Sequence, residues 1–399
     1  MGTIPYARQD INQEDIDAVI AVLSSDFLTQ GPIVPAFEKA IMDYCGSQYA
    51  IAVNSATSAL HIACLALGVC KGDLVWTSPI TFVASANCAL YCGATVDFVD
   101  IDPLTYNLSV DRLSEKLALA KIAGNLPKVL IAVHLCGQSC DMANIYALSQ
   151  IYGFRIIEDA SHAIGGKYRS PINRAKQSSH FEPIGNGRYS DITVFSFHPV
   201  KIITTGEGGM AVTNNKDLAK HMRLLRSHGI SDTKEDFQYR SIEEIWNYQQ
   251  INLGFNYRMT DIQAALGLCQ MKRLNSFIEK RHQIAIRYDE ELSKLPIKTP
   301  WQHIDTYSSY HLYPVRIRSD KNVKNQRQIY NALRSEGINV NVHYIPVYRQ
   351  PYYETMKFRE GYCLEAERYY KETLSLPIYS TLTDTEQTKV IQTLHEILK

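Results

Sequence analysis

The sequence predicts an α/β protein, in which a large domain with a mostly parallel sheet is followed by a smaller C-terminal α+β domain. Short apolar strands alternate with helical segments between residues 49 and 213, a pattern typical of a parallel sheet covered by helices on both faces. Beyond Pro296 the texture changes to alternating segments that favour an antiparallel sheet. The length of 399 residues is sufficient for two such domains.

The composition excludes several classes of partner. The chain balances 41 Lys and Arg residues against 41 Asp and Glu residues, so it lacks the basic face of a nucleic-acid-binding protein. The first residues lack the charged and apolar regions of a signal peptide, and no apolar run approaches the length of a membrane span. We therefore expect a cytoplasmic protein with no nucleic-acid partner and no membrane partner.

The cysteines indicate reduced thiols rather than disulfides or metal ligands. Their number, 9, is odd, and several of them fall within apolar strand or helix patterns. Cys136 and Cys140 are close enough to suggest a metal or redox pair, but no second Cys or His pair has ligand spacing. We expect no metal site.

The chain begins with an irregular segment, residues 4–9, and two predicted helices, residues 12–23 with Asn12 as N-cap and residues 33–44. A strand over residues 49–53 then enters a turn of small hydroxyl residues, and a helix is predicted from residue 59 to residue 67. Such a turn presents free backbone amides to an anion, although an ordinary capped helix explains the same residues.

The next strands are predicted over residues 74–77, 95–99, 129–133 and 155–157, and the last of them ends in Glu158 and Asp159. Ligands of parallel sheets collect at the carboxyl ends of the strands. Four segments lie just past a predicted strand end: residues 55–57, residues 79–82, Asp159 and residues 196–201. They can therefore converge on one crevice.

Between Tyr168 and Tyr189 the pattern lapses, and we interpret this connection of about 20 residues as a solvated insertion rather than an active-site flap. Thr260 begins a long helical pattern that runs to Leu292 and resembles a helix connecting two domains. An antiparallel strand (310–317), a helix (327–336), a strand (340–343) and two further helices are predicted to complete the smaller unit.

These patterns predict three parts. Residues 1–14 form a segment that packs with the small domain or the substrate site, and residues 15–275 form the large domain. Residues 276–399 form the small domain together with the connecting helix.

One lysine stands on an arch between two predicted strands. The first strand ends at His198 and Pro199, because proline cannot donate to a sheet ladder, and Lys201 follows. Glycines then let the backbone fold back toward a strand that begins at Met210. Partial burial would lower the pKa of the lysine and free its amine to attack a carbonyl. A lysine in a surface hairpin is the alternative that these residues leave open.

Asp159, which follows the predicted strand over residues 155–157, is the second candidate site residue. A buried Asp159 needs a cationic partner, which can be an arginine, a helix amino terminus or a protonated pyridine nitrogen. Pyridoxal 5′-phosphate (PLP) needs a lysine, an acid for its ring nitrogen, a plane against its ring and donors for its phosphate. Candidates for all four occur in this chain.

At this point the chain resembles a known family. The segments are SATSAL (55–60), SPITF (78–82), EDA (158–160), SFHPVK (196–201), TTGEGG (204–209) and GFNYRM (254–259). Together they resemble the DegT/StrS-type nucleotide-sugar aminotransferases, which are PLP enzymes with the fold-type I architecture of aspartate aminotransferase. Residues 190–205 and 342–347 resemble the members that act in pseudaminic acid biosynthesis. That resemblance implies a homodimer that uses L-glutamate to aminate C4 of UDP-4-keto-6-deoxy-N-acetyl-β-L-altrosamine.

The resemblance also implies residue roles. Lys201 would form the imine with PLP and move the protons, Asp159 would pair with the pyridinium, and Phe82 would stack on the ring. The other implied cofactor contacts are Ala56, Thr57 and Ser196 at the phosphate, His162 near the 3-hydroxyl, and Asn256 from the neighbouring subunit. The implied substrate contacts are Tyr6, Arg258 and Tyr344.

Three alternatives stand beside this reading. The same chemistry could serve another NDP-4-keto or 3-keto deoxysugar, or the chain could bind PLP as a regulator without turnover. A nicotinamide-dependent enzyme is disfavoured, because no glycine-rich dinucleotide turn follows the first strand. Relatives that dehydrate at C3 carry His at the lysine position, whereas this chain has Lys201 there.

Overall fold

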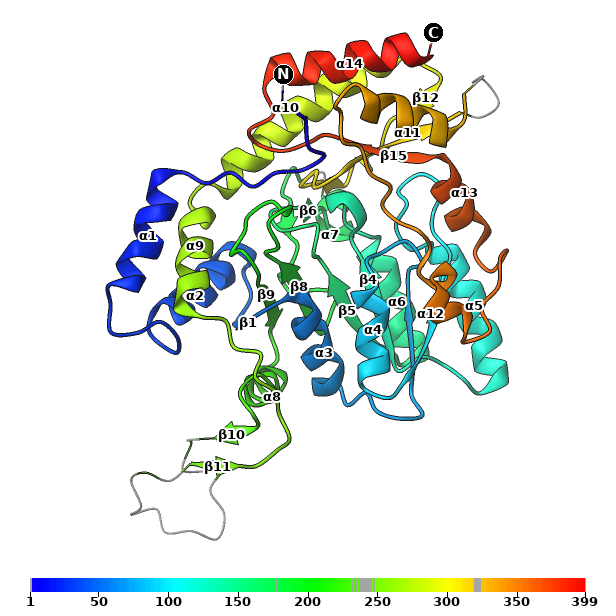
Figure 1. The fold of residues 1–399 in the computed structure, drawn as a ribbon. Helices are drawn as coiled ribbons and strands as arrows, with labels where there is room; N and C mark the ends of the chain where they lie inside the picture. Colours follow the sequence, from blue (N-terminus) through cyan, green and yellow to red (C-terminus); the bar gives the residue numbers. More distant parts are fainter. Residues whose placement is uncertain are drawn as a thin grey trace.

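A seven-stranded sheet forms the centre of the molecule in this computed structural model (Figure 1). The structure describes residues 2–176, 178–231, 233, 236, 246, 248–318 and 324–398. The strands lie in the order β1-β9-β8-β5-β4-β2-β3, and β9 runs against the others. They are β1 (Tyr49–Val53), β2 (Leu74–Thr77), β3 (Thr95–Phe98), β4 (Val129–Val133), β5 (Arg155–Asp159), β8 (Ile192–Ser196) and β9 (Gly209–Thr213).

Helices cover both faces of this sheet, which confirms the predicted α/β class. The helices are α1 (Gln13–Leu23), α2 (Ile33–Cys45), α3 (Ala56–Ala66), α4 (Ala84–Tyr91), α5 (Val110–Ala123), α6 (Met142–Tyr152), α8 (Lys216–Arg226) and α9 (Asp261–Met271). Successive side chains of one strand enter different cores: Ile51 packs with α3, α4 and α8, while Ala52 packs with α2 and α9. The strands are therefore buried on both faces.

Local capping sets where the helices begin. Asn12 caps α1 in a capping box with Asp15, as the sequence predicts. The helix α3 begins three residues earlier than predicted, because Ser55 accepts a hydrogen bond from the Ser58 amide at 3.1 Å and acts as its N-cap. The turn of small hydroxyl residues is thus the first turn of the helix itself.

The prediction of one long helix from Thr260 to Leu292 is wrong. The chain forms α9 and α10 (Leu274–Leu292), with a break at Lys272 and Arg273. The guanidinium of Arg273 binds the carboxylates of Asp10 and Asp15, which ties the break to the amino-terminal segment. No glycine or proline marks this break, so the apolar period continues through it.

The smaller unit lies at one end of the molecule, where both termini also lie (Figure 1). Its antiparallel sheet has the order β12-β14-β15, and its helices pack around one apolar core. Its elements are α10, β12 (Ile297–Lys298), β14 (Tyr313–Ile317), α11 (Gln326–Ser335), α13 (Leu364–Glu372), β15 (Thr373–Leu376) and α14 (Asp384–Leu398). The predicted strand over residues 340–343 is wrong: Ile338 and Asn341 make only single bridges, to Ile4 and Ser375.

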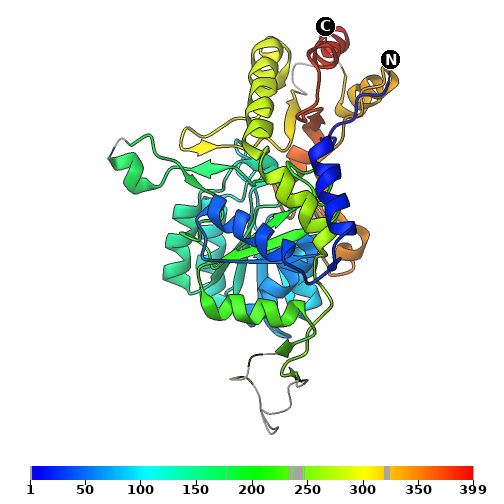
Figure 2. The ribbon, with the colours of Figure 1, turned by 90° about the vertical axis from the view of Figure 1, so that its left-hand side faces the viewer.

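The connection after Tyr168 is not a structureless insertion. It follows β6 (Lys167–Tyr168) and contains α7 (Pro171–Ala175) and β7 (Glu182–Pro183), and β6 pairs with both β7 and β13 (Thr306–Tyr307). Figure 2 shows this small sheet projecting from the side of the molecule. These strands of two residues are too short for the apolar pattern to reveal them. Gln177, within the same connection, lies outside the described residues.

The remaining described elements are the 3-10 turns η1 (Leu135–Gly137) and η3 (Val347–Arg349), the short helix α12 (Pro351–Glu354), and the paired strands β10 (Ile230–Ser231) and β11 (Gln249–Gln250). Across the described ranges, every helix is either too short or too polar to cross a lipid bilayer.

Candidate active site

Lys201 stands on a tight arch between β8 and β9. Its amide donates a hydrogen bond to the carbonyl of His198 at 2.8 Å. At the base of the arch, the Phe197 amide donates to the Gly208 carbonyl at 2.9 Å, and the Thr205 amide donates to the Phe197 carbonyl at 3.0 Å. Gly206 has a φ of +79°, a conformation that glycine adopts without strain. The arch therefore holds the lysine at the carboxyl end of β8.

The amine of Lys201 has an unusual environment. Burial lowers its pKa to about 8, and the negative charge of Asp159 opposes part of that shift. A lysine amine with this pKa is partly neutral near pH 7.5, and only the neutral amine attacks a carbonyl. Lys201 as a residue is half-buried, and the burial that lowers the pKa of its amine disfavours the surface-hairpin alternative.

Asp159 is the last residue of β5 and is only 4% exposed. Its Oδ2 accepts a hydrogen bond from the Ser85 hydroxyl at 2.6 Å, and its Oδ1 accepts one from the Ser161 amide at 3.1 Å. The Thr81 hydroxyl oxygen lies 2.7 Å from the Ser85 hydroxyl oxygen, within hydrogen-bond distance. Within the described ranges, no arginine or histidine forms an ion pair with Asp159, so the carboxylate remains available to a cation.

The strands β1, β8 and β9 meet the amino terminus of α3. Gly209 is paired with Val53 on one side and with Ser196 on the other. A Cβ atom on Gly209 would lie 2.5 Å from the Ala56 nitrogen, so the backbone passes directly beneath the first turn of α3. The amides of Ala56 and Thr57 have no hydrogen-bond partner in the part of the chain that is described. Free amides at a helix amino terminus attract phosphate.

Phe82 follows β2 at the same edge of the sheet, just before α4. It is 59% exposed, although its neighbours Ile80 and Ala84 are buried in the core. A phenylalanine in this position does not pack the core, so its ring is free to stack on a ligand.

His162 and Tyr344 form a hydrogen-bonded pair close to Lys201. The Cys136 amide donates to Nδ1 of His162 at 3.3 Å, and Nε2 of His162 lies 3.1 Å from the Tyr344 hydroxyl. Burial, then the charge of Lys201, holds the pKa of His162 well below its usual range, so the ring is neutral. Both ring nitrogens therefore already have partners within the chain.

Sequence reasoning missed two more histidines in this region. The ring of His311 lies 4.3 Å from that of His162, and His343 lies 5.2 Å from the ring of Tyr6. Burial is the main cause that lowers the pKa of both histidines, to about 3 for His343, and the positive charge of Lys201 adds to it. The signal that could have found His343 is its position directly before Tyr344.

The other predicted contacts lie around these groups. Tyr6 is half-buried, and its carbonyl accepts from the Ile378 amide at 3.2 Å. The segment with Asn256 and Arg258 runs beside the end of β1, where the Asn54 amide donates to the Tyr257 carbonyl at 2.8 Å. Asn256 itself is exposed, and Arg258 is half-buried. Neither side chain reaches the cofactor residues within one subunit through any described hydrogen bond.

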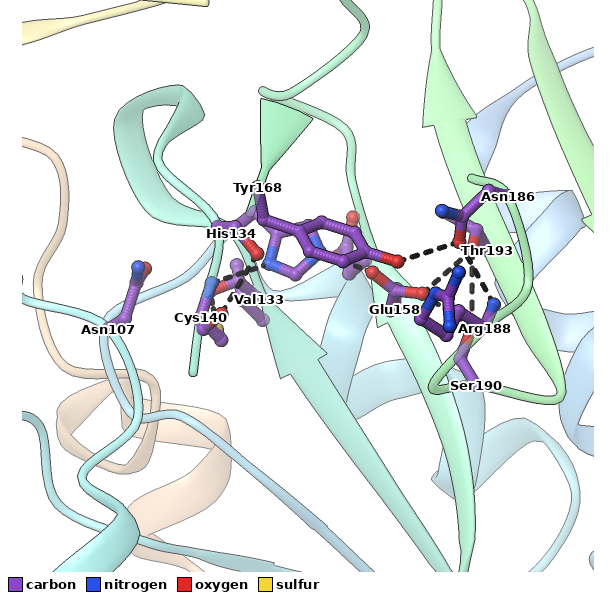
Figure 3. Close-up of polar contacts among 12 residues, drawn as sticks. Asn107, Val133, His134, Cys140, Glu158, Tyr168, Asn186, Arg188, Ser190 and Thr193 are labelled. Atoms are coloured by element: carbon purple, nitrogen blue, oxygen red, sulfur yellow. Dashed lines mark hydrogen bonds and ion pairs between the residues drawn. The ribbon is translucent and has the colours of Figure 1, made fainter. Parts of the chain in front are cut away.

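The reverse face of β5 carries a second buried carboxylate (Figure 3). The carboxylate of Glu158 lies 2.7 Å from Nε2 of His134, the residue directly after β4. On its other side, it accepts from the hydroxyls of Ser190 and Thr193. The Cys140 amide donates to Nδ1 of His134 at 3.1 Å, so Nε2 carries the hydrogen that Glu158 accepts. Burial would raise the pKa of Glu158, but the hydrogen bonds from His134, Ser190 and Thr193 lower it. The carboxylate is therefore ionised.

The residues around Lys201 and Asp159 fit PLP on observations of the structure itself. The backbone of Gly209 packs directly against the first turn of α3, where the amides of Ala56 and Thr57 have no partner among the described residues. The pyridinium of PLP would supply the cation that buried Asp159 lacks. Among the described residues, no cluster of three or more His, Cys, Asp or Glu side chains could hold a metal ion.

A cavity of about 570 Å³ lies elsewhere, between the β6–α7 segment and the loops that follow β3 and β4. Arg169, Arg174 and Asp305 are among its lining residues, and both arginines pair with Asp305. Neither Lys201 nor Asp159 lines it. This cavity is therefore separate from the region around Lys201 and Asp159.

Comparisons with known proteins show the family. Residues 9–395 match the DegT/DnrJ/EryC1/StrS aminotransferase family. The chain is 37% identical over 399 residues to the spore coat polysaccharide biosynthesis protein SpsC of Bacillus subtilis, covering 99% of this chain and 97% of SpsC. It is also 37% identical over 399 residues to the UDP-4-amino-4,6-dideoxy-N-acetyl-β-L-altrosamine transaminase of Campylobacter jejuni, covering 99% and 98%.

A solved structure of an aminotransferase has the same fold. PseC of Helicobacter pylori, an aminotransferase involved in the biosynthesis of pseudaminic acid, superposes with a TM-score of 0.87 at 29% identity and covers 99% of both chains. Other similar structures include PLP and PMP forms of a sugar aminotransferase. The chain is therefore a member of the DegT/DnrJ/EryC1/StrS family of PLP-dependent sugar aminotransferases, with the fold-type I architecture that the sequence predicts.

Proposed function

We propose that this enzyme transfers the amino group of L-glutamate to C4 of UDP-4-keto-6-deoxy-N-acetyl-β-L-altrosamine, and that it does so in the cytoplasm as a homodimer. The observation that carries the proposal is Lys201, a half-buried lysine on the arch after β8 whose amine has a lowered pKa and interacts with the carboxylate of Asp159. The choice of sugar is supported by the C. jejuni transaminase and by H. pylori PseC.

The proposed cofactor site follows the chain's own groups. Lys201 would bind the aldehyde carbon, Asp159 would hold the ring nitrogen in its protonated form, and Phe82 would cover one face of the ring. The Ala56 and Thr57 amides and the Ser196 hydroxyl would bind the phosphate, together with Asn256 of the other subunit. His162 would border the ring, and Tyr6, Arg258 and Tyr344 would contact the sugar nucleotide.

The mechanism depends on one amine that changes its protonation state. Bound PLP supplies an electron sink for the carbon from which a proton is removed. Once a substrate amine takes its place, Lys201 would be free, and its lowered pKa would let it remove that proton and return it at the carbon on the other side of the nitrogen. The Ser85 hydroxyl and the Ser161 amide donate to Asp159 and orient its carboxylate. Glutamate and the sugar use the same lysine in turn, so we expect ping-pong kinetics.

The test is product identification with purified keto sugars. With glutamate and the UDP-4-keto sugar, mass spectrometry and NMR should show a 4-amino product and one 2-oxoglutarate for each amine formed. Lys201→Ala should retain less than about a thousandth of this rate, because the base and the imine partner are both lost. Turnover of Lys201→Ala at the wild-type rate would refute the assignment.

The proposal also names one sugar substrate, which has to be distinguished from other keto sugars. SpsC is as similar to this chain as the C. jejuni transaminase is, so the same chemistry on another NDP-4-keto or 3-keto deoxysugar is the second candidate. A panel of NDP-keto sugars with glutamate separates the two. A protein that binds PLP but releases no 2-oxoglutarate with any of them would instead be a regulator.

The homodimer is supported by an unpartnered apolar face at α1 and the turn after it. Exposed apolar side chains gather there: Ile16, Ile20, Leu23, Phe27 and Leu28. If Asn256 completes the partner's site, a mixture of Lys201→Ala and Asn256→Ala subunits should form heterodimers in which one site has both residues. Remixing should then restore activity that neither variant shows alone. Two inactive homodimers that stay inactive on mixing would contradict shared sites.

A further inference from the structure

The pair formed by His162 and Tyr344 has a defined direction of hydrogen bonding. Nδ1 of His162 accepts the Cys136 N–H at 3.3 Å, so it carries no hydrogen. The ring is buried and neutral, and its one hydrogen must therefore lie on Nε2. This N–H donates to the Tyr344 oxygen at 3.1 Å.

Because the Tyr344 oxygen accepts from His162, the hydrogen of the Tyr344 hydroxyl is available to a different partner. Among the described residues, His162 is the only side chain that hydrogen-bonds this hydroxyl. Tyr344 is half-buried, and its phenol interacts electrostatically with Cys136, Tyr6 and Asp159. Burial raises its pKa, so the hydroxyl keeps its hydrogen at neutral pH. Within the described part of the chain, the Tyr344 hydroxyl is thus a protonated donor without an acceptor.

The backbone around His162 is built to keep this direction. Cys136, whose amide donates to His162, has a φ of +61°, which is uncommon for a residue other than glycine. Next to it, a Cβ on Gly137 would lie 2.4 Å from the Ser309 hydroxyl oxygen and 3.0 Å from the His162 carbonyl oxygen. The Ser309 hydroxyl in turn donates to that carbonyl at 2.7 Å. The imidazole is therefore fixed from the loop after β4 and from the segment before β14.

We propose that Tyr344 is a catalytic residue that carries a proton to and from the carbonyl oxygen of the substrates, and that His162 is its positioning residue. The proposal rests on the aminotransferase function proposed above. When a keto carbon condenses with a primary amine, a C=N bond forms and the C–O bond breaks. The oxygen leaves as water, and both hydrogens of that water come from the amine nitrogen.

Tyr344 would relay one of these hydrogens. It gives its own proton to the departing oxygen, and it is reprotonated by the proton that the nitrogen loses, so it ends unchanged. While the phenol oxygen carries negative charge, the Nε2–H of His162 stabilises it. In the reverse direction, the same relay serves the release of 2-oxoglutarate.

The test separates carbonyl chemistry from the earlier proton transfer. In deuterated water, exchange of the glutamate α-hydrogen requires Lys201 but no C–O bond. In PLP-loaded Tyr344→Phe, NMR should show this exchange within about threefold of wild type, while formation of 2-oxoglutarate and of the amino sugar falls about 100-fold. Tyr352→Phe, at a tyrosine that is 62% exposed, controls for the substitution. Equal losses in exchange and in carbonyl steps, or no loss in either, would overturn the proposal.

Variants at His162 test the positioning role. His162→Gln can accept from the Cys136 amide and donate to Tyr344, so it should keep about a third or more of the carbonyl rate. His162→Leu should resemble Tyr344→Phe. A Gln variant that is as slow as the Leu variant would contradict the relay.

A readout without PLP tests the direction of the bond. In nitrogen-15 NMR of the apoprotein, the histidine signals that disappear in His162→Gln should report a neutral ring with hydrogen on Nε2 from pH 6 to pH 8. A signal with hydrogen on Nδ1, or one that titrates in this range, would overturn the assignment. The absence of turnover in wild type would count against the proposed function, whereas the relay is judged on this NMR signal and on variant-to-wild-type ratios.

Discussion

The hydroxyl of Ser85 on α4 donates a 2.6 Å hydrogen bond to the carboxylate of Asp159 at the end of β5. The two residues are 74 positions apart in the sequence, and the bond is buried. It joins a helix on one face of the sheet to the acid that we assign to the ring nitrogen of PLP.

Removal of this hydroxyl should weaken PLP binding. A hydrogen bond to a charged group contributes about 1.5–3 kcal/mol, so Ser85→Ala should raise the dissociation constant of PLP about 10- to 100-fold. Ser85→Thr, which keeps a hydroxyl, is the matched control. Fluorescence titration of the apoprotein measures both, and an unchanged constant in Ser85→Ala would show that Asp159 needs no such support.

The pKa of Lys201 sets a pH dependence with a definite sign. Its amine reacts when neutral, so the rate at which apoprotein combines with PLP should rise with pH and level off above a midpoint near 8. At pH 7.5 about a quarter of the amine is neutral, against about one in a thousand for an ordinary lysine. Asp159→Asn should move the midpoint lower, because Asp159 raises this pKa. A midpoint near 10.5 would contradict the burial of the amine.

Gly209 should tolerate no side chain. The Cβ of Gly209→Ala would lie 2.5 Å from the Ala56 nitrogen and from the Ser55 carbonyl carbon, which would displace the first turn of α3. We expect a loss of about 1–3 kcal/mol in stability and at least a tenfold loss of PLP affinity, seen by thermal melting and titration. Gly2→Ala, whose Cβ would have no neighbour within 4 Å, is the control. Normal PLP affinity in Gly209→Ala would place the phosphate elsewhere.

Glu158 should stabilise the fold except in acid. Its pKa in the folded chain is lower than its ordinary value of 4.5, so its contribution is full at neutral pH. The contribution is lost as the pH falls below 4.5 toward the lower folded value. Glu158→Gln should therefore cost about 1.5–3 kcal/mol in urea denaturation at pH 7, and the gap to wild type should narrow at pH 3.5.

The control for Glu158 is Glu115→Gln. Glu115 pairs with Arg112 on the surface, where both side chains are 63% exposed, so its loss should change stability by less than about 0.5 kcal/mol. A gap for Glu158→Gln that is equally large at both pH values would show that packing, not charge, explains its effect.

The sequence was sufficient to predict the strand ends that carry Lys201 and Asp159, because apolar strands and the breaks after them are local patterns. It did not reveal Ser85 or the Cys136 amide, since each acts through one contact with a distant segment. The break between α9 and α10 has no glycine or proline to mark it, and the Arg273 pairs that fix it come from the amino terminus. The domain division after residue 275 stays a prediction, and α10 begins at Leu274, beside it.

The most direct test of the central claim is to trap the amine that binds PLP. Wild-type protein should turn yellow with PLP, and reduction with borohydride followed by peptide mass spectrometry should place the phosphopyridoxyl group on Lys201. Prior addition of L-glutamate should bleach the colour and prevent the labelling. A label on another lysine, or equal labelling of Lys201→Ala, would contradict the account.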